Sequence, residues 1–445
     1  MESTTKTSSS NACADCRSQK RKCDKTLPSC SRCINFQPIQ PYWNNITSRQ
    51  LDVDRYYVGL AMTALADQSV SLDTILSEYF CHIHPWLPVI IERSFRNRLS
   101  QLHSSPCADI AMLLLAVSLV VGMKAQNGHQ ANIYQITKYL FAYLQLLREP
   151  SLQLVQGGLL LTLYELGSSL VQEASVSIGN CARLGYIQRL DLDDGVNHHD
   201  FTRFSESEER RRVWCGLYML DRLIYQVATG FIAPHAVVEP RDTFRIPVDD
   251  SLLSTWSSTP EYPPSFSTPA EIPLCYFARE IQGVRILGPV QMLRQSSDID
   301  WSSEKFSMLD RTLMYFMNKL IAQTPGSWAV LCGANAIGLA SGIMLHQDRL
   351  SRGSRGLVSS EEAKASYLAL SSFVKMVSDI CFKFDAMEAT KKIPWVPLPA
   401  VMCVGEAAIA VKYLTPIFEG CFQLDSEPFR RVLSYATKTW KLAGE

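Results

Sequence analysis

The sequence lacks an apolar run long enough to cross a bilayer. Its longest largely apolar run, at 110–123, has 14 residues, whereas a membrane-spanning helix needs about 20. The opening MESTTKTSSS has no apolar core of the kind that a secretory signal requires. We therefore expect a disordered polar tail at 1–11, no export, no membrane partner, and a buried helix at 110–123.

Signatures of common enzymes are absent as well. The sequence contains no G-x-S-x-G, no H-E-x-x-H, no P-loop and no dinucleotide-binding fingerprint. It also contains no internal repeat and no sustained heptad pattern. We expect a protein that is not an enzyme, and a zinc or thiol enzyme is the remotest interpretation.

Charge is balanced over the whole chain but not at its beginning. The chain has 43 Lys and Arg against 43 Asp and Glu. Up to Cys33, seven basic side chains against three acidic ones leave a net charge of +4, so the remainder carries −4. A local basic surplus favours contact with nucleic acid.

The same basic segment, CADCRSQKRKCDKTLPSCSRC, contains a cluster of cysteines. Two C-x-x-C pairs flank a single cysteine, giving Cys13, Cys16, Cys23, Cys30 and Cys33. Each pair can place two thiolates on one zinc ion from the first turn of a short helix. Free thiols or a redox pair are the alternative, but the chain has 14 cysteines and no sign of export, which favours metal ligands over disulfides. Because 12–34 holds too few apolar residues for a core, we expect metal to hold this module together.

The residue pattern of the rest of the chain is typical of an all-α protein. NFQPIQPYWNN, with two prolines and five Asn or Gln residues, indicates a linker, which we extend over 35–70. A large helical domain is expected over 71–445. Helical periodicity predicts helices at 72–82, 92–101, 107–124, 130–148, 151–170, 172–184, 206–228, 272–295, 303–322, 327–347, 361–385, 398–413 and 427–442. The Ser/Pro-rich stretch 257–271 is expected to be a solvated surface loop.

Several polar patterns in the helical region have a structural interpretation. Ser205 and Glu208 have capping-box spacing and predict a helix start. Asp221 and the arginines at 211, 212 and 222 are expected to form a buried or partly buried ion-pair network. His82 and His84, spaced i and i+2, face opposite ways on a helix, so we expect a polar contact at a helix end rather than a metal pair. His198 and His199, among aspartates, are expected in a solvated loop.

The cysteine stretch resembles the zinc binuclear cluster of fungal transcription factors. That pattern is C-x-x-C, six residues, C, five to nine or so residues, C-x-x-C, and a sixth cysteine several residues on; the five cysteines named above match its first five positions. The resemblance implies two zinc ions bridged by Cys13 and Cys30. It also implies that Cys16 and Cys23 complete the first zinc site and that Cys33 belongs to the second.

The sixth position of this pattern is empty in the sequence. Two four-coordinate zinc ions need eight bonds, and five thiolates with two bridging supply seven. The next cysteine after Cys33 is Cys81. Water, His82 or His84 could fill the gap, but structural zinc sites are normally closed, so we favour a missing piece of chain at an altered exon junction. Sequencing the transcript across codons 33 to 50 tests that hypothesis.

The basic run between the second and third cysteines has an implied role in DNA binding. By resemblance, its helix enters the major groove and reads bases through Gln19 and Lys20. Arg17, Arg21 and Lys22 would then position the module on phosphates. CGG-type half-sites are implied, although glutamine is a mild departure from the two basic residues that are frequent at these positions.

Three further stretches resemble the fungal-specific regulatory domain, namely SEYFCHIHPWLPVI, IGNCARLGYIQRL and SEERRRVWCGLYMLDRLI at 77–90, 178–190 and 207–224. The resemblance implies a nuclear regulator of transcription by RNA polymerase II, with the transcription machinery as a partner. It also implies control of one pathway, such as a secondary-metabolite gene cluster. A homodimer and a monomer on one half-site are both open. The alternative is an interaction protein whose incomplete zinc cluster binds DNA weakly or not at all.

Overall fold

The computed structural model describes residues 17, 22, 23, 25, 46–66, 70–124, 128–193, 200–228, 234–254, 264–323, 332–388, 395–414 and 425–444. The chain forms two compact units, Met1–Asp54 and Arg55–Glu445. Across the described ranges the regular structure is helical, with one isolated antiparallel bridge between Arg245 and Ser265 and no strand. The prediction of an all-α fold is confirmed.

Helix α3 (Ile46–Ala66) corrects the linker prediction, because that linker was extended through residue 70. The linker-type composition, with its prolines and amides, is confined to 35–45. Apolar residues of α3 recur at helical spacing, and their side chains are buried: Tyr57, Val58, Ala61, Ala64 and Leu65. The ring of Tyr57 packs against Tyr143 of helix α7 (Gly128–Leu147), with 5.5 Å between centroids. From Arg55 onward α3 therefore belongs to the helical unit.

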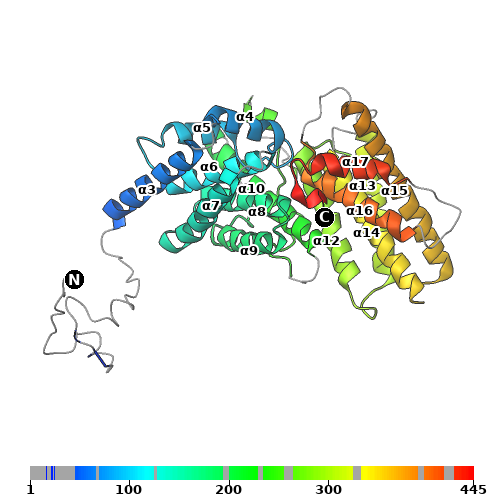
Figure 1. Cartoon of the computed structure of the whole chain (residues 1–445). Helices are drawn as coiled ribbons and strands as arrows, with labels where there is room; N and C mark the ends of the chain where they lie inside the picture. Colours follow the sequence, from blue (N-terminus) through cyan, green and yellow to red (C-terminus); the bar gives the residue numbers. More distant parts are fainter. Residues whose placement is uncertain are drawn as a thin grey trace. The chain divides into compact units, whose positions relative to one another are not determined.

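The first half of the helical unit is built around helices α6, α8, α9 and α10 (Figure 1). Its elements are α4 (Leu72–His82), α5 (Glu92–Ser100), α6 (Ala108–Val121), the 3-10 turn η1 (Gly122–Lys124), α7 (Gly128–Leu147), α8 (Leu152–Gly167), α9 (Val171–Ile187) and α10 (Phe201–Val227). All residues of α6 except Val121 are buried, which confirms the buried helix predicted at 110–123. Gly158 of α8 lets the helices approach closely, since a Cβ there would lie 2.5 Å from Cys181 Sγ and from the Phe141 ring.

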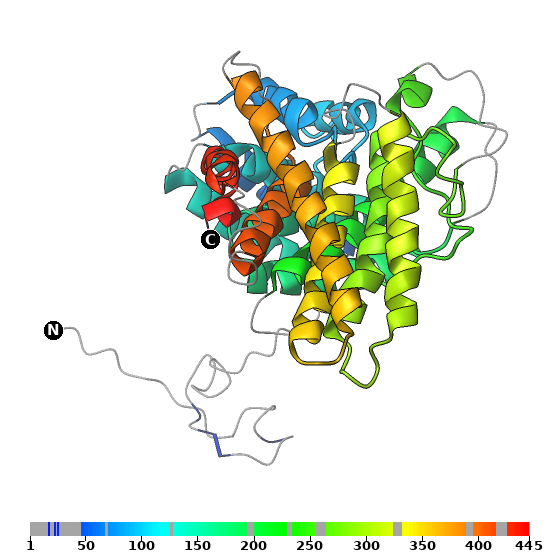
Figure 2. The same ribbon diagram turned by 90° about the vertical axis from the view of Figure 1, so that its right-hand side faces the viewer.

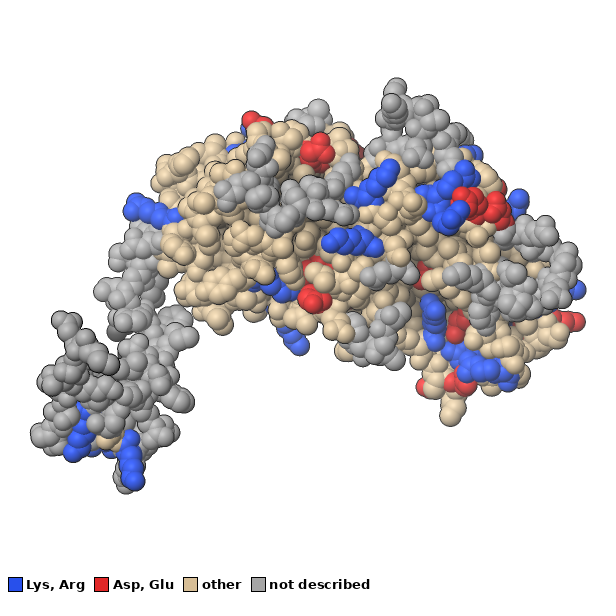
Figure 3. Space-filling view, viewed as in Figure 1, with Lys and Arg blue, Asp and Glu red and all other residues tan. Residues whose placement is uncertain are grey.

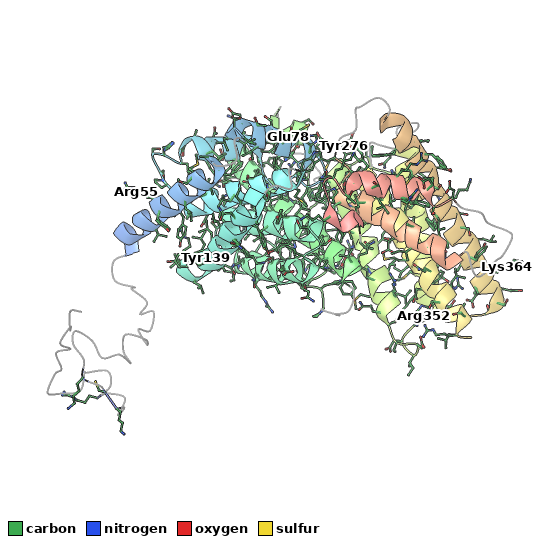
Figure 4. The ribbon with its side chains drawn as sticks, viewed as in Figure 1. Arg55, Glu78, Tyr139, Tyr276, Arg352 and Lys364 are labelled. Atoms are coloured by element: carbon green, nitrogen blue, oxygen red, sulfur yellow. The ribbon has the colours of Figure 1, made fainter. Side chains whose placement is uncertain are left out.

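The second half forms a second bundle. Its elements are α11 (Asp250–Ser254), α12 (Tyr276–Gln295), α13 (Ser303–Gln323), α14 (Cys332–Ser354), α15 (Ser360–Glu388), α16 (Leu398–Leu414), α17 (Glu427–Ala436) and the 3-10 turn η2 (Lys441–Gly444). Figure 2 shows α13, α14 and α15 running side by side, and α14 also packs on α12 and α16. Arg352, labelled in Figure 4, ties the end of α14 to the end of α12 through Asp298 at 2.7 Å and the carbonyl of Ser296 at 3.0 Å.

An aromatic cluster joins the two halves. The fully buried Trp440, just after α17, makes edge-on contacts with Trp86 and Trp395 at centroid distances of 6.2 and 6.4 Å. Its indole Nε1 donates to the carbonyl of Val396 at 2.7 Å. Trp440 also packs so closely on Gly167 of α8 that a Cβ there would lie 2.5 Å from the ring. The end of the described chain is thus built into the core of the first half.

The sequence has no uninterrupted apolar run of the necessary length, yet one helix in the described part of the chain, α15 over Ser360–Phe384, is long and apolar enough to span a membrane by length and composition. Half of the apolar stretch of α15 is buried inside the helical unit. Its core residues are Leu370, Phe373, Val374 and Val377. Burial among α14, α16 and α17 accounts for its apolar character.

Candidate metal and DNA-binding module and its regulatory core

The described part of the N-terminal unit presents basic side chains to solvent (Figure 3). Arg17, Lys22 and Lys25 are exposed, while Cys23 is half-buried. Lys25 has a left-handed backbone, with φ of 61°. The other predicted site residues lie outside the described residues: Cys13, Cys16, Gln19, Lys20, Arg21, Cys30 and Cys33. At the four described positions of this segment the cations are exposed and the thiol is partly covered.

The cysteine thiolates of this module are suitable ligands for zinc. Thiolate sulfur is a preferred zinc ligand, and the segment contains few apolar side chains that could fold without metal. The number of donors is one short for two closed tetrahedral sites. His82 and His84, considered above as substitutes, are engaged within the helical unit, as described next.

Both histidines make polar contacts at the end of α4, which confirms the helix-end interpretation. His82 Nε2 lies 3.3 Å from Glu78 Oε2, and its ring stacks on Trp395 with centroids 5.3 Å apart. His84 Nε2 lies 2.9 Å from Asp250 Oδ2. Among the described residues there is no group of three or more His, Cys, Asp or Glu side chains placed to hold a metal ion. The pair at 198 and 199 lies outside the described residues.

Helix α10 begins earlier than the capping-box spacing predicted. Asp200 is the N-cap, and its Oδ1 accepts a hydrogen bond from the Thr202 amide at 3.3 Å. Ser205 and Glu208 therefore lie inside the helix, and the prediction that they open it was wrong. Glu208 is fully buried and has a different role.

Glu208 is the centre of a buried ion-pair network. It accepts hydrogen bonds from Arg211 Nη1 at 2.5 Å and from Arg212 Nε at 2.9 Å. Arg212 continues to Asp250 Oδ1 at 2.5 Å and to the carbonyl of Val248 at 2.9 Å, and the Val248 amide donates to Glu208 Oε1 at 2.9 Å. Burial lowers the pKa of Arg212, but the two carboxylates outweigh it and leave the pKa above its usual value. Through Val248 and Asp250, the network attaches the segment that leads into α11 to helix α10.

A second network lies more than three turns from Glu208 along α10. Asp221 accepts hydrogen bonds from the backbone amides of Ala236 and Val237, each at 3.1 Å. Arg222 donates to Asp221 Oδ2 at 2.6 Å and to the Val237 carbonyl at 2.9 Å, and its guanidinium lies 4.6 Å from the Tyr218 ring centroid. Burial raises the pKa of Asp221, and Arg222 opposes that shift. The prediction that the arginines at 211, 212 and 222 form buried ion pairs is confirmed, and Asp221 pairs with Arg222 as predicted. Arg211 and Arg212 pair with other carboxylates, so the prediction of one shared network was wrong.

The sequence interpretation missed the acidic partners that complete the two networks. Glu208 was assigned to a cap, while Asp193, Asp250 and Glu239 received no role in the network. Asp193 and Glu239 lie in irregular segments, and Asp250 opens the short helix α11, so no helical spacing links them to α10. The signal in the sequence was the run of arginines itself, since buried arginines need carboxylate partners.

Both the N-terminal segment and the first half of the helical unit match known protein families. Residues 11–39 match the fungal Zn(2)-Cys(6) binuclear cluster domain, which binds two zinc ions, and residues 76–228 match the fungal specific transcription factor domain. The first match contains the five cysteines of the cluster. The second begins within α4 and ends one residue after α10.

Curated relatives agree with these matches. Transcription factor BOA15 of Botryotinia fuckeliana is 30% identical over 143 residues, which are 32% of this chain and 80% of the relative. Transcription factor tazR of Aspergillus terreus is 31% identical over 157 residues, and transcription factor AN6788 of Emericella nidulans is 28% identical over 295 residues. These matches span 33% and 63% of this chain but only 24% and 43% of the two relatives. No solved structure matches the chain significantly. The chain belongs to the fungal transcription factors that combine a Zn(2)-Cys(6) cluster with a fungal specific transcription factor domain.

Proposed function

We propose that this protein is a sequence-specific DNA-binding regulator of transcription by RNA polymerase II that acts in the nucleus. The observation that carries the proposal is the match of 11–39 to the binuclear cluster domain, in a segment with a basic surplus. The exposure of Arg17 and Lys22 supports it, because cations that contact phosphates must face solvent in the free protein. Membership of this family also supports a role other than catalysis.

The proposed division of labour in the module follows from its residue types. Cys13, Cys16, Cys23, Cys30 and Cys33 hold zinc, which fixes the helix after Cys16. Lysine is suited to guanine acceptors and glutamine to adenine, so Lys20 and Gln19 read base edges. The remaining basic residues, Arg17, Arg21 and Lys22, anchor the module on phosphates. CGG-type half-sites and control of one pathway, such as a secondary-metabolite gene cluster, are part of the proposal.

The helical unit is proposed as the regulatory part, which contacts the transcription machinery. It folds around its own core, and its two buried networks on α10 fix neighbouring segments rather than forming a catalytic centre. Pairing of two chains would run through this unit, since the sequence has no heptad segment after Cys33. A monomer on a single half-site is the other arrangement.

A gel-shift titration of the full chain tests the proposal. Duplexes with a CGG-type half-site and with the same bases scrambled are compared at two salt concentrations. Specific binding should be about a thousandfold or more tighter than non-specific binding at physiological salt, and both should weaken as salt rises. Equal affinity for both duplexes would remove sequence specificity from the proposal.

A second function is favoured by one observation, the presence of five rather than six cysteines within the matched cluster domain. In that case the protein is an interaction partner whose degenerate cluster binds DNA weakly. Zinc stoichiometry distinguishes the two functions. Two zinc ions per chain with a gel shift support the first, and one or none without a shift supports the second.

A further inference from the structure

A cavity of about 370 Å³ opens where the turn after α9 meets the first half of α10. Small-molecule sites in proteins have volumes of about 300–1,000 Å³, so this one can hold a compact ligand. Leu190, Leu192 and Phe244 line its apolar part. Arg189, Arg210 and Arg211 line its polar part.

The charges around this cavity do not cancel. Asp193 is its acidic residue, and that carboxylate is already held by Arg211 at 3.6 Å and by the side chain and backbone amide of Arg245 at 3.5 and 3.0 Å. Arg210 donates to the carbonyl of Gln188 at 2.5 Å. Within the described ranges no carboxylate forms an ion pair with Arg189 or Arg210. Among the described residues that line the cavity, three arginines and one aspartate leave two positive charges.

Arg211 adds a buried donor without a partner. Its side chain is 7% exposed and uses Nη1 and Nη2 on Glu208 and Asp193. Its Nε is buried and makes no hydrogen bond. A buried donor of this kind is costly when nothing accepts from it, so protein groups leave the arginine cluster at the cavity incompletely satisfied.

The backbone at Arg189 is a further unusual feature of this cavity. The Leu190 amide bonds the Gly185 carbonyl and the Arg189 amide bonds the Tyr186 carbonyl, each at 2.9 Å, which is the Schellman ending of a helix. The residue in the left-handed position of that motif is usually glycine. Here it is Arg189, with φ of 56°. Arg189 thus places a guanidinium at the cavity from a backbone position at which glycine would give a more stable fold.

We propose that this cavity binds a small organic anion, a carboxylate or a phosphate ester with an apolar portion. Arg189 and Arg210 contact the anionic group, and Leu190, Leu192 and Phe244 contact the apolar portion. Because Arg211 also belongs to the Glu208 network, bound anion and network share one side chain. The proposal goes beyond the DNA-binding function and does not depend on it.

The test is isothermal titration of the zinc-loaded full chain with phenyl phosphate, phenylacetate and the neutral benzyl alcohol at equal ionic strength. The variants are Arg189→Gly and Arg210→Gln. Arg189→Gly keeps the turn, because glycine readily adopts this backbone, so it should fold at least as well as the wild type. Arg183→Ala is the matched control, since Arg183 is an exposed arginine on α9, the helix that precedes Arg189, and it does not line the cavity.

The expected result is that at least one anionic probe binds more tightly than benzyl alcohol. Its affinity should fall about tenfold or more in Arg189→Gly, as expected for the loss of one charge-assisted contact, and should stay unchanged in Arg183→Ala. Phenyl phosphate or phenylacetate as the tighter probe identifies the phosphate or the carboxylate class. If neither anion binds better than benzyl alcohol, or if Arg189→Gly binds as tightly as the wild type, the proposal is overturned. Should Arg210→Gln fail to fold, Arg189→Gly decides alone.

Discussion

Arg212 Nε and Glu208 Oε1, one turn apart on α10, are joined at 2.9 Å by a hydrogen bond between side chains that are 1% and 0% exposed. Glu208 also neutralises Arg211. Removing one partner of a buried ion pair leaves an uncompensated charge, which costs about 3–5 kcal/mol. We therefore expect Glu208→Ala to lower the free energy of unfolding by about that amount, measured by urea denaturation.

Glu206→Ala is the control for this prediction. Glu206 is exposed on the same helix, and surface substitutions usually change stability by no more than about 0.5 kcal/mol. A similar small effect of Glu208→Ala would show that the network does not stabilise the fold.

Glu280 predicts a pH dependence of stability. It lies buried in α12, no hydrogen bond to its Oε2 is formed within the described structure, and burial raises the pKa of its carboxyl well above 4.5. Above pH 4.5 the unfolded chain loses this proton while the folded chain retains it, so stability falls as pH rises. Glu280→Gln removes that effect. Its stability relative to the wild type should increase by about 1.4 kcal/mol per pH unit until the folded carboxyl ionises.

Thermal unfolding between pH 4 and 8 measures this difference, with Glu361→Gln as the control because Glu361 is exposed in the first turn of α15. Parallel pH profiles for Glu280→Gln and the wild type would contradict the assignment of a protonated buried carboxyl.

Gly158 and Gly179 should respond to alanine in opposite ways. A Cβ on Gly158 would lie 2.5 Å from Cys181 Sγ and the Phe141 ring, whereas one on Gly179 would have no atom within 4 Å. Overpacking costs about 1–3 kcal/mol, while alanine in an open helical position gains about 0.5–1 kcal/mol over glycine. Gly158→Ala should lower the melting temperature and Gly179→Ala should raise it. The same sign for both would contradict the close contact of α8 with α7 and α9.

Substitutions of Cys23 and Cys81 distinguish a zinc ligand from a cysteine outside the cluster. Cys23 belongs to the matched cluster domain, and Cys81 is exposed on α4. We expect Cys23→Ser to lower the zinc bound per chain, counted by atomic emission, and to weaken DNA binding. Cys81→Ser should change neither. Loss of zinc in both variants, or in neither, would argue against the proposed ligand set.

Arg17 and Lys20 should affect DNA binding differently. Lys20→Ala should reduce the preference for the cognate duplex by about 1–3 kcal/mol. Arg17→Ala should weaken specific and random duplex alike and reduce the salt slope by about one. Fluorescence anisotropy on both duplexes measures this. Equal losses on both duplexes for both variants would refute the division between base reading and phosphate anchoring.

Most of the helices could be predicted from the sequence because helical periodicity and capping residues depend only on neighbouring residues. Ser71 caps α4 with its side chain, and this helix spans Leu72–His82 as predicted. Helix α3 was missed because its buried residues include alanines and a tyrosine rather than a run of large aliphatic side chains. The start of α10 was misplaced because Ser205 and Glu208 have the spacing of a capping box without its position.

The anion cavity could not have been predicted in the same way. Phe244 comes to it from a segment 55 residues after Arg189 along the chain. The left-handed backbone of Arg189 is invisible in a sequence that has arginine where glycine would have marked the turn. Partners distant in the chain, such as Asp250 for Arg212, depend on tertiary packing in the same way.

The most direct test of the central claim, that zinc held by the N-terminal cysteines creates the DNA-binding surface, is a reversible removal of the metal. The affinity of the full chain for a CGG-type duplex is measured before chelation, after it, and after zinc is restored, while circular dichroism follows the helical unit. The account predicts that DNA binding is lost and regained while the helical signal changes little. Unchanged affinity in the zinc-free chain would contradict it.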